Sequence, residues 1–175
     1  MIHQTHLWTV ALDHLSSGQY TAPDYLVIES RVEWKQQATG IAVVPVVGDR
    51  IGLLRIHRHA VNRCMWEIPM GFMDADEVPL AAALRELQEE TAIAAKASAM
   101  MDLGFVTPVP STLRARIQLF AARAGHSIAI PHGEIGLGPL HLVSRAEAKS
   151  MVLDGTIEEP TTAVAIFRYL NRTGW

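Results

Sequence analysis

Residues 71–93 read GFMDADEVPLAAALRELQEETAI, a glycine followed by an acidic turn and a helix-forming segment. The segment 80–91 is rich in Ala, Leu, Glu and Arg, has no internal Gly or Pro, and follows Pro79, which suits a first helical turn. Leu80, Leu84 and Leu87 recur at i, i+4 and i+7. This spacing predicts a helix whose leucine stripe faces a core.

Acidic residues gather on the same predicted helix. Glu86 and Glu90 are i, i+4 neighbours, and Glu89 is i+3 from Glu86. At about 100° per residue, we expect their shared face to point more than a quarter-turn away from the leucines. Arg85 neutralises only part of this charge, so divalent cations held by carboxylate oxygens are the favoured interpretation. A solvated acidic helix face is the alternative.

The spacing of these residues resembles the Nudix box, G-x5-E-x7-R-E-U-x-E-E-x-G-U, where U is a bulky aliphatic residue. Residues 71–93 agree with it at eight of nine specified positions. The exception is Ala92, where the family has Gly. A Gly after a helix usually adopts a left-handed conformation, so Ala92 either costs about 1 kcal/mol or lets the helix run on. We expect metal binding to persist, because Ala92 carries no ligand.

Two stretches before the box add a second resemblance. RIHR (residues 55–58) and WEIPMG (residues 66–71) resemble the R-Q-Y-R and W-E-L-P-A-G patterns of ADP-ribose pyrophosphatases and related nucleoside-diphosphate-sugar hydrolases. The resemblance implies that Arg58, Trp66 and Glu67 bind substrate and that the Met70 carbonyl binds metal. A core aromatic is the alternative for Trp66.

The resemblance also implies roles for the box residues. Glu86 and Glu90 are expected to bind Mg²⁺, or alternatively Mn²⁺, and Glu89 to act as a third ligand or to orient water. Arg85 is expected to brace the carboxylates, and Glu77 to fix the geometry between loop and helix. Glu134, in a loop-like stretch at residues 125–139, is a candidate catalytic base, with a solvated loop glutamate as the alternative.

The region after Pro110 departs from the subfamily, which often places Gly and an acid there. Ser111, Thr112, Leu113 and Arg114 follow instead, which leaves the identity of the sugar open. Arg114 and Arg116 are candidates for phosphate contacts or are ordinary surface arginines.

The expected function is therefore Mg²⁺-dependent hydrolysis of ADP-ribose or a related nucleoside diphosphate sugar to a nucleoside monophosphate and a sugar phosphate. One alternative is a house-cleaning nucleoside triphosphate pyrophosphatase. The other, from a different class, is a nucleotide-binding sensor without catalysis.

Composition bounds these expectations. The 175 residues are 49% hydrophobic and 19% charged, which indicates a globular protein. A net charge of −3 gives no indication of a nucleic-acid partner, and no apolar run approaches the ~20 residues that a membrane helix needs. The single Cys64 excludes an internal disulfide, and no signal pattern opens the chain. We expect a cytoplasmic protein without a membrane partner.

The element pattern predicts an α+β protein. Residues 1–38 are expected to be an N-terminal β extension, with strands near 7–12 and 25–34 that add to the main sheet or support a homodimer. Residues 39–175 would form the Nudix domain, and the resemblance supplies its α/β/α sandwich with a mixed sheet between helices. Strands are expected at residues 40–47, 51–57, 98–106, 116–122 and 140–143, and Pro45 predicts an edge or a bulge in the first of these. Helices should follow Ser144 and Pro160, the latter with Val164, Phe167 and Leu170 on one face.

Overall fold

The computed structural model describes residues 2–30, 38–125 and 135–174. Its main sheet has the order β11-β5-β4-β10-β8, with β6 paired to β5 and β7 paired to β4. The strands of this sheet are β4 (Gly40–Val47), β5 (Arg50–Arg58), β6 (Arg63–Glu67), β7 (Met70–Phe72), β8 (Met100–Val106), β10 (Ile117–Ala124) and β11 (Leu137–Ser144). The sheet is mixed, because β4 and β10 run parallel and the other pairs are antiparallel.

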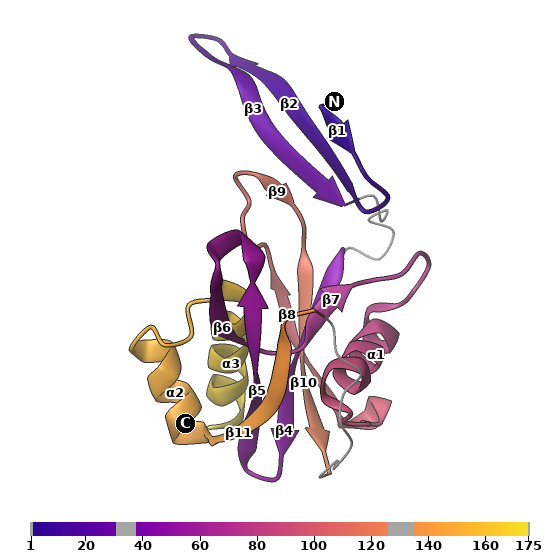
Figure 1. Ribbon diagram of the computed structural model, residues 1–175, viewed down its shortest axis with the longest axis vertical. Coiled ribbons are helices and arrows are strands. Elements are labelled where there is room, and N and C mark those ends of the chain that lie inside the picture. The colour runs from indigo at the N-terminus through magenta and orange to yellow at the C-terminus, as the bar shows by residue number, and fades with distance from the viewer. Residues whose placement is uncertain (1, 31–37, 126–134, 175) are drawn as a thin grey trace.

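Helices cover both faces of this sheet (Figure 1). α1 (Pro79–Thr91) packs on one face, and α2 (Arg145–Leu153) and α3 (Pro160–Thr173) lie on the other. Successive β4 side chains alternate between the two cores: Ile41 and Val43 join the α1 side, while Ala42 and Val44 join the α3 side. A continuous apolar run is what a strand buried on both faces requires. The predicted α/β/α sandwich is confirmed.

The N-terminal segment forms a second sheet, which corrects the expectation that its strands extend the main one. β1 (His3–Gln4), β2 (Trp8–Ser17) and β3 (Tyr20–Ser30) pair with β9 (Leu113–Arg114) in the order β1-β2-β3-β9. The long hairpin of β2 and β3 projects beyond the layered body (Figure 1). β9, which is parallel to β3 at Ile28 and Glu29, ties this sheet to the chain beyond the box, and the Ile28 N–H donates to the Thr112 carbonyl just before β9. Residues 25–30 of the strand predicted at 25–34 belong to β3, and its last four positions lie outside the described residues.

Two local expectations about the body are wrong in part. Of the two alternatives for Pro45, the sheet edge is excluded, because β4 is an interior strand. The β4–β5 pairs stop at Val46, so the N–H that Pro45 lacks is not needed in that ladder. On α3 the prediction fails for Phe167, which is 49% exposed, whereas Leu170 is buried and Val164 packs against the core as expected. Ala165, Ile166 and Tyr169 complete the buried face.

The expected starts of both C-terminal helices are confirmed. Ser144 caps α2 by accepting a hydrogen bond from the Glu147 N–H, and Pro160 opens α3. Gly104 lies in β8 at φ +82°, next to a register shift between β8 and β10. No helix in the described ranges is long and apolar enough to cross a membrane.

Candidate active site

Gly71 and Glu86 meet at the centre of the site. A Cβ placed on Gly71 would lie 2.1 Å from Glu86 Oε1 and 2.3 Å from its carboxyl carbon. The carboxylate of α1 therefore rests on the bare backbone of β7. Only glycine leaves the room for this contact.

Glu86 and Glu90 lie on the buried face of α1, which corrects the predicted separation between acids and leucines. Their residues are 6% and 5% exposed, and they share that face with Ala82, Ala83 and Leu87. Leu80 and Leu84 are only half-buried. The two alanines make room for the helix to approach the sheet along this side, which draws Glu86 and Glu90 inward. Glu89 is exposed, with 55% of its side chain accessible.

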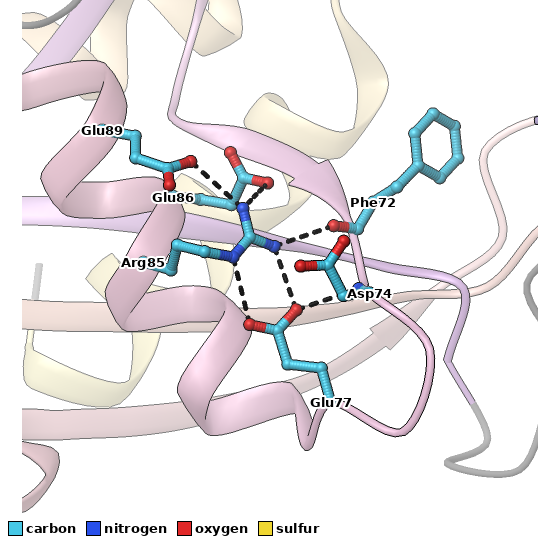
Figure 2. Close-up of polar contacts among 6 residues, drawn as sticks. All are labelled: Phe72, Asp74, Glu77, Arg85, Glu86 and Glu89. Carbon is cyan, nitrogen blue, oxygen red and sulfur yellow. Dashed lines mark hydrogen bonds and ion pairs between the residues drawn. The ribbon is translucent and has the colours of Figure 1, made fainter.

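Arg85 joins the acids of the box (Figure 2). Its Nη1 donates to Glu86 Oε1 at 2.8 Å and to Glu89 Oε2 at 3.1 Å. Its Nε and Nη2 donate to the two oxygens of Glu77 at 3.1 and 3.0 Å, and Nη2 also donates to the Phe72 carbonyl. The hydrogen bonds that Arg85 donates, mainly to Glu77 and also to Glu86, raise the pKa of Arg85, so it stays charged. The guanidinium thus holds the carboxylates in place, as the box predicts for this position.

Glu77 fixes the turn that enters α1. Its Oε2 accepts the Asp74 N–H at 3.0 Å, and its own N–H donates to the Asp74 carbonyl at 3.1 Å. The hydrogen bonds from Arg85 are the main cause that lowers the pKa of Glu77. These contacts are those expected of a residue that sets the geometry between loop and helix.

Ala92 ends α1 in the left-handed conformation, at φ 57° and ψ 14°. Its N–H donates to the Gln88 carbonyl at 2.8 Å. Ala92 therefore has the backbone conformation expected of the family's Gly. Of the two predicted outcomes, a strained Ala92 is observed, and the helix does not run on. A non-glycine residue in this region costs about 1 kcal/mol.

The acidic set offers oxygen donors suited to a hard divalent cation. Glu86 Oε1 and Glu89 Oε2 converge on one Arg85 nitrogen, and Glu90 lies beside Glu86 on the buried face. Within the described residues the Glu90 Oε2 atom is buried and accepts no hydrogen bond, although the residue has other polar interactions. No three His, Cys, Asp or Glu side chains of the described ranges form a ready-made cage. Mg²⁺ commonly keeps its waters and uses one or two carboxylates plus substrate phosphate, so the residues fit an open site of that kind.

A cavity of about 230 Å³ opens beside the box. Arg58, Met70 and Gly71 line it together with Trp8 from the N-terminal sheet and Phe72 from β7. The Trp8 and Phe72 rings meet edge to face, with centroids 5.0 Å apart. The other lining residues are Thr39, Gly40, Ile41, Leu113, Ala115 and Ile117. Sequence reasoning missed Trp8 and Phe72, because only the tertiary fold brings the first strands to the box.

Arg58 and Glu67 bind each other in the structure. Arg58 Nε donates to Glu67 Oε1 at 2.9 Å, and Nη2 donates to Oε2 at 2.6 Å. The Glu67 side chain is 1% exposed, whereas that of Arg58 is 44% exposed. Of this pair, Arg58 lines the cavity and Glu67 does not.

Trp66 is not among the residues that line this cavity. Its ring packs edge to face on His141 at 5.0 Å and lies under the Arg55 guanidinium, also at 5.0 Å. It also packs against the core on the α3 side. These contacts favour the core-aromatic interpretation over the predicted role in substrate binding.

The two candidate arginines after Pro110 contact side chains of the protein itself. Arg114 pairs with Glu29 at 2.9 Å, and the Arg116 guanidinium lies 3.9 Å from the centroid of the Phe105 ring. Glu134 lies outside the described residues, so its assignment as a base stays a prediction. The role of the Met70 carbonyl as a metal ligand also stays a prediction.

Comparisons with known proteins agree with this geometry. A family model described as NUDIX domain matches residues 36–146. One solved structure, described as "Crystal structure of ADP compounds hydrolase", has a TM-score of 0.76 at 21% identity and covers 99% of this chain and 91% of that chain. At that identity the likeness shows the fold. A search of curated protein sequences gave no match.

Because the family model spans more than half of the chain, the chain belongs to the Nudix family. The predicted enzyme class, a Nudix pyrophosphohydrolase, is confirmed at the level of family and fold.

Proposed function

We propose that this chain hydrolyses the pyrophosphate of ADP-ribose or a related nucleoside diphosphate sugar, with Mg²⁺ or alternatively Mn²⁺, to a nucleoside monophosphate and a sugar phosphate. The observation that carries the proposal is the position of the buried box carboxylates next to a cavity with an aromatic wall and an arginine. The structural neighbour described as an ADP compounds hydrolase supports the choice of substrate class.

The box residues would have two roles, namely binding the divalent ions and orienting the attacking water. Glu86, Glu90 and the Met70 carbonyl would hold the divalent ions, and Glu89 would orient the attacking water. When bound, the ions would neutralise charge on the phosphate oxygens and activate the water. Arg85 keeps the carboxylates in register through its bonds to Glu77, Glu86 and Glu89. Glu134 is proposed as the base that accepts the proton of the water.

The cavity beside the box would bind the diphosphate and the base of the substrate. Arg58 offers a guanidinium to the diphosphate, because it lines the cavity beside Met70 and Gly71. The Trp8 and Phe72 rings stand nearly perpendicular to each other at the cavity, and a ring face offers an apolar surface on which a planar base can stack. A volume of about 230 Å³ suits part of a nucleotide, with the remainder extending toward solvent.

A hydrolysis screen with Mg²⁺ tests the proposal, with an added phosphatase that releases inorganic phosphate from the phosphomonoester products but does not act on the intact diphosphate substrates. Its substrates are ADP-ribose, other nucleotide sugars, dinucleotides and nucleoside triphosphates, with product analysis to identify the bond that is cut. Preferred cleavage of ADP-ribose or an ADP-sugar supports the proposal. A preference for triphosphates favours a house-cleaning enzyme, and tight ADP-ribose binding without cleavage of any substrate favours a sensor.

Substitution of a metal ligand gives a second test. Glu90→Gln should reduce turnover by roughly a hundredfold or more while the protein stays folded. Glu147→Gln, on the exposed first turn of α2, is the control and should leave turnover unchanged. Undiminished activity of Glu90→Gln would show that Glu90 is not a ligand. The homodimer and the cytoplasmic location stay predictions.

A further inference from the structure

The Glu67 carboxylate is fully engaged inside the protein. It is 1% exposed, and each of its oxygens accepts one hydrogen bond from Arg58, at 2.9 and 2.6 Å. This is the two-point geometry in which a guanidinium and a carboxylate fix each other's orientation. Glu67 therefore has no exposed oxygen with which to contact a ligand.

Arg58, in contrast, has one edge inside the protein and one outside. The Nε and Nη2 edge faces Glu67, while 44% of the side chain is exposed and the residue lines the cavity beside Met70 and Gly71. Within the described residues, Nη1 makes no hydrogen bond. Glu67, through its hydrogen bond, is the main cause that raises the pKa of Arg58, and the charges of Glu90 and Glu159 raise it further. The outer edge is thus a permanent cation next to the box.

We propose that Glu67 is a positioning residue that holds one edge of Arg58 so that the other edge accepts an anionic oxygen of the substrate in the cavity. The inference rests on the proposed function for the identity of the anion, a nucleoside diphosphate. It replaces the predicted direct contact between Glu67 and substrate with an action through Arg58. An arginine side chain has four rotatable bonds and loses conformational entropy when it is ordered. Because Glu67 already orders Arg58 in the free protein, less entropy is lost when substrate binds.

Three variants separate this role from a purely structural one. Glu67→Gln retains the size of the side chain but loses the charge that locks the guanidinium, and Arg58→Lys loses the two-point fit. The third is the double variant. The readouts are the Kd for ADP by calorimetry with Mg²⁺, KM and kcat for the substrate that the wild-type enzyme cleaves best, and Tm.

The expected result is a rise of roughly tenfold to a hundredfold in both Kd and KM for each single variant, with a much smaller change in kcat. The double variant should be no worse than Arg58→Lys alone, because Glu67 acts only through Arg58. Glu158→Gln is the matched control. It breaks the exposed ion pair to Arg63, which sits opposite Arg58 on the same hairpin, and should leave Kd and KM unchanged.

Three results would overturn the inference. If Glu67→Gln lowers Tm but leaves Kd and KM at the wild-type values, the pair is only structural. If the effects of the two single substitutions add in the double variant, Glu67 acts on the substrate independently. If Glu67→Gln does not fold, Arg58→Lys with unchanged Kd and KM overturns the inference as well.

The outcome does not depend on the substrate assignment. Wild-type enzyme that cleaves a triphosphate and ignores ADP-ribose contradicts the proposed function, while the variants' KM for that triphosphate still decides the role of Glu67.

Discussion

The Glu86 carboxylate lies against the Cα of Gly71, where an added methyl group would come within 2.1 Å of Oε1. Helix α1 and strand β7 are thus locked together at the point where the proposed metal ligands gather. Because the conflict involves a buried side chain and backbone, neither partner can move away cheaply.

Gly71→Ala is therefore expected to lower the free energy of unfolding by about 2 kcal/mol and to abolish metal-dependent turnover. Urea unfolding and the substrate assay measure the two effects. Gly125→Ala is the control, since a Cβ there meets nothing within 4 Å and its φ is not in the left-handed region. Retention of full activity by Gly71→Ala would place the catalytic carboxylates elsewhere.

Ala92 offers a gain in stability. Ala92→Gly should raise the free energy of unfolding by about 0.5–1 kcal/mol, because glycine adopts the observed φ of 57° without strain. Thermal and urea unfolding measure the change. Ala81→Gly, at an exposed position inside the same helix, should instead lower stability by about 1 kcal/mol. Equal effects of the two substitutions would contradict the strain argument.

The Glu77–Arg85 interaction should depend on pH. The pKa of Glu77 is lowered in the folded protein, mainly by its hydrogen bonds from Arg85. A lowered folded-state pKa means that this stabilisation is complete above the unfolded value, about 4.3, and is lost as pH falls through the folded value.

Glu77→Gln should therefore destabilise the protein by about 1 kcal/mol at neutral pH, and the difference from wild type should shrink as pH falls below about 4. Urea unfolding across this range measures the difference. A gap that stays constant from neutral to acid pH would show that the ionised form of Glu77 is not what matters.

Trp8 connects the N-terminal sheet to the cavity. Trp8→Ala should raise KM for ADP-ribose roughly threefold to tenfold with little change in kcat, because a ring contact contributes about 0.5–1.5 kcal/mol. Tyr20→Ala, at the exposed far end of the same hairpin, controls for the loss of an aromatic residue there. If KM is unchanged in Trp8→Ala, the Trp8 ring does not contact the substrate.

The sequence predicted those features that depend on local chemistry. Box spacing identified the family, Pro79 and Pro160 marked helix starts, and the serine cap at Ser144 formed as expected. The predicted buried face of α1 was wrong, because it was inferred from the leucines alone. Ala82 and Ala83 are buried, and their small size lets the helix approach the sheet on their side. Periodicity alone does not weigh small residues against large ones.

Other features depend on tertiary contacts that no local pattern encodes. The pairing of Arg58 with Glu67 is hidden in the sequence, since both residues match a substrate-binding motif. The contact between Trp8 and Phe72 joins residues that are far apart in the chain. Trp66 was assigned to substrate from the same motif, although its ring packs on His141 and Arg55.

The parallel pairing of β4 with β10 also bears on how the protein is made. β10 begins about 70 positions after β4 ends. During synthesis on the ribosome, the apolar segment GIAVVPVV is therefore made several seconds before the strand that pairs with it. Pro45 lies within this apolar segment and lacks an N–H, which hinders the segment from forming β-strand pairs with other unfolded chains. A truncated product that ends after the box would carry every proposed glutamate ligand but would lack both the proposed base, Glu134, and the strand β10 that pairs with β4.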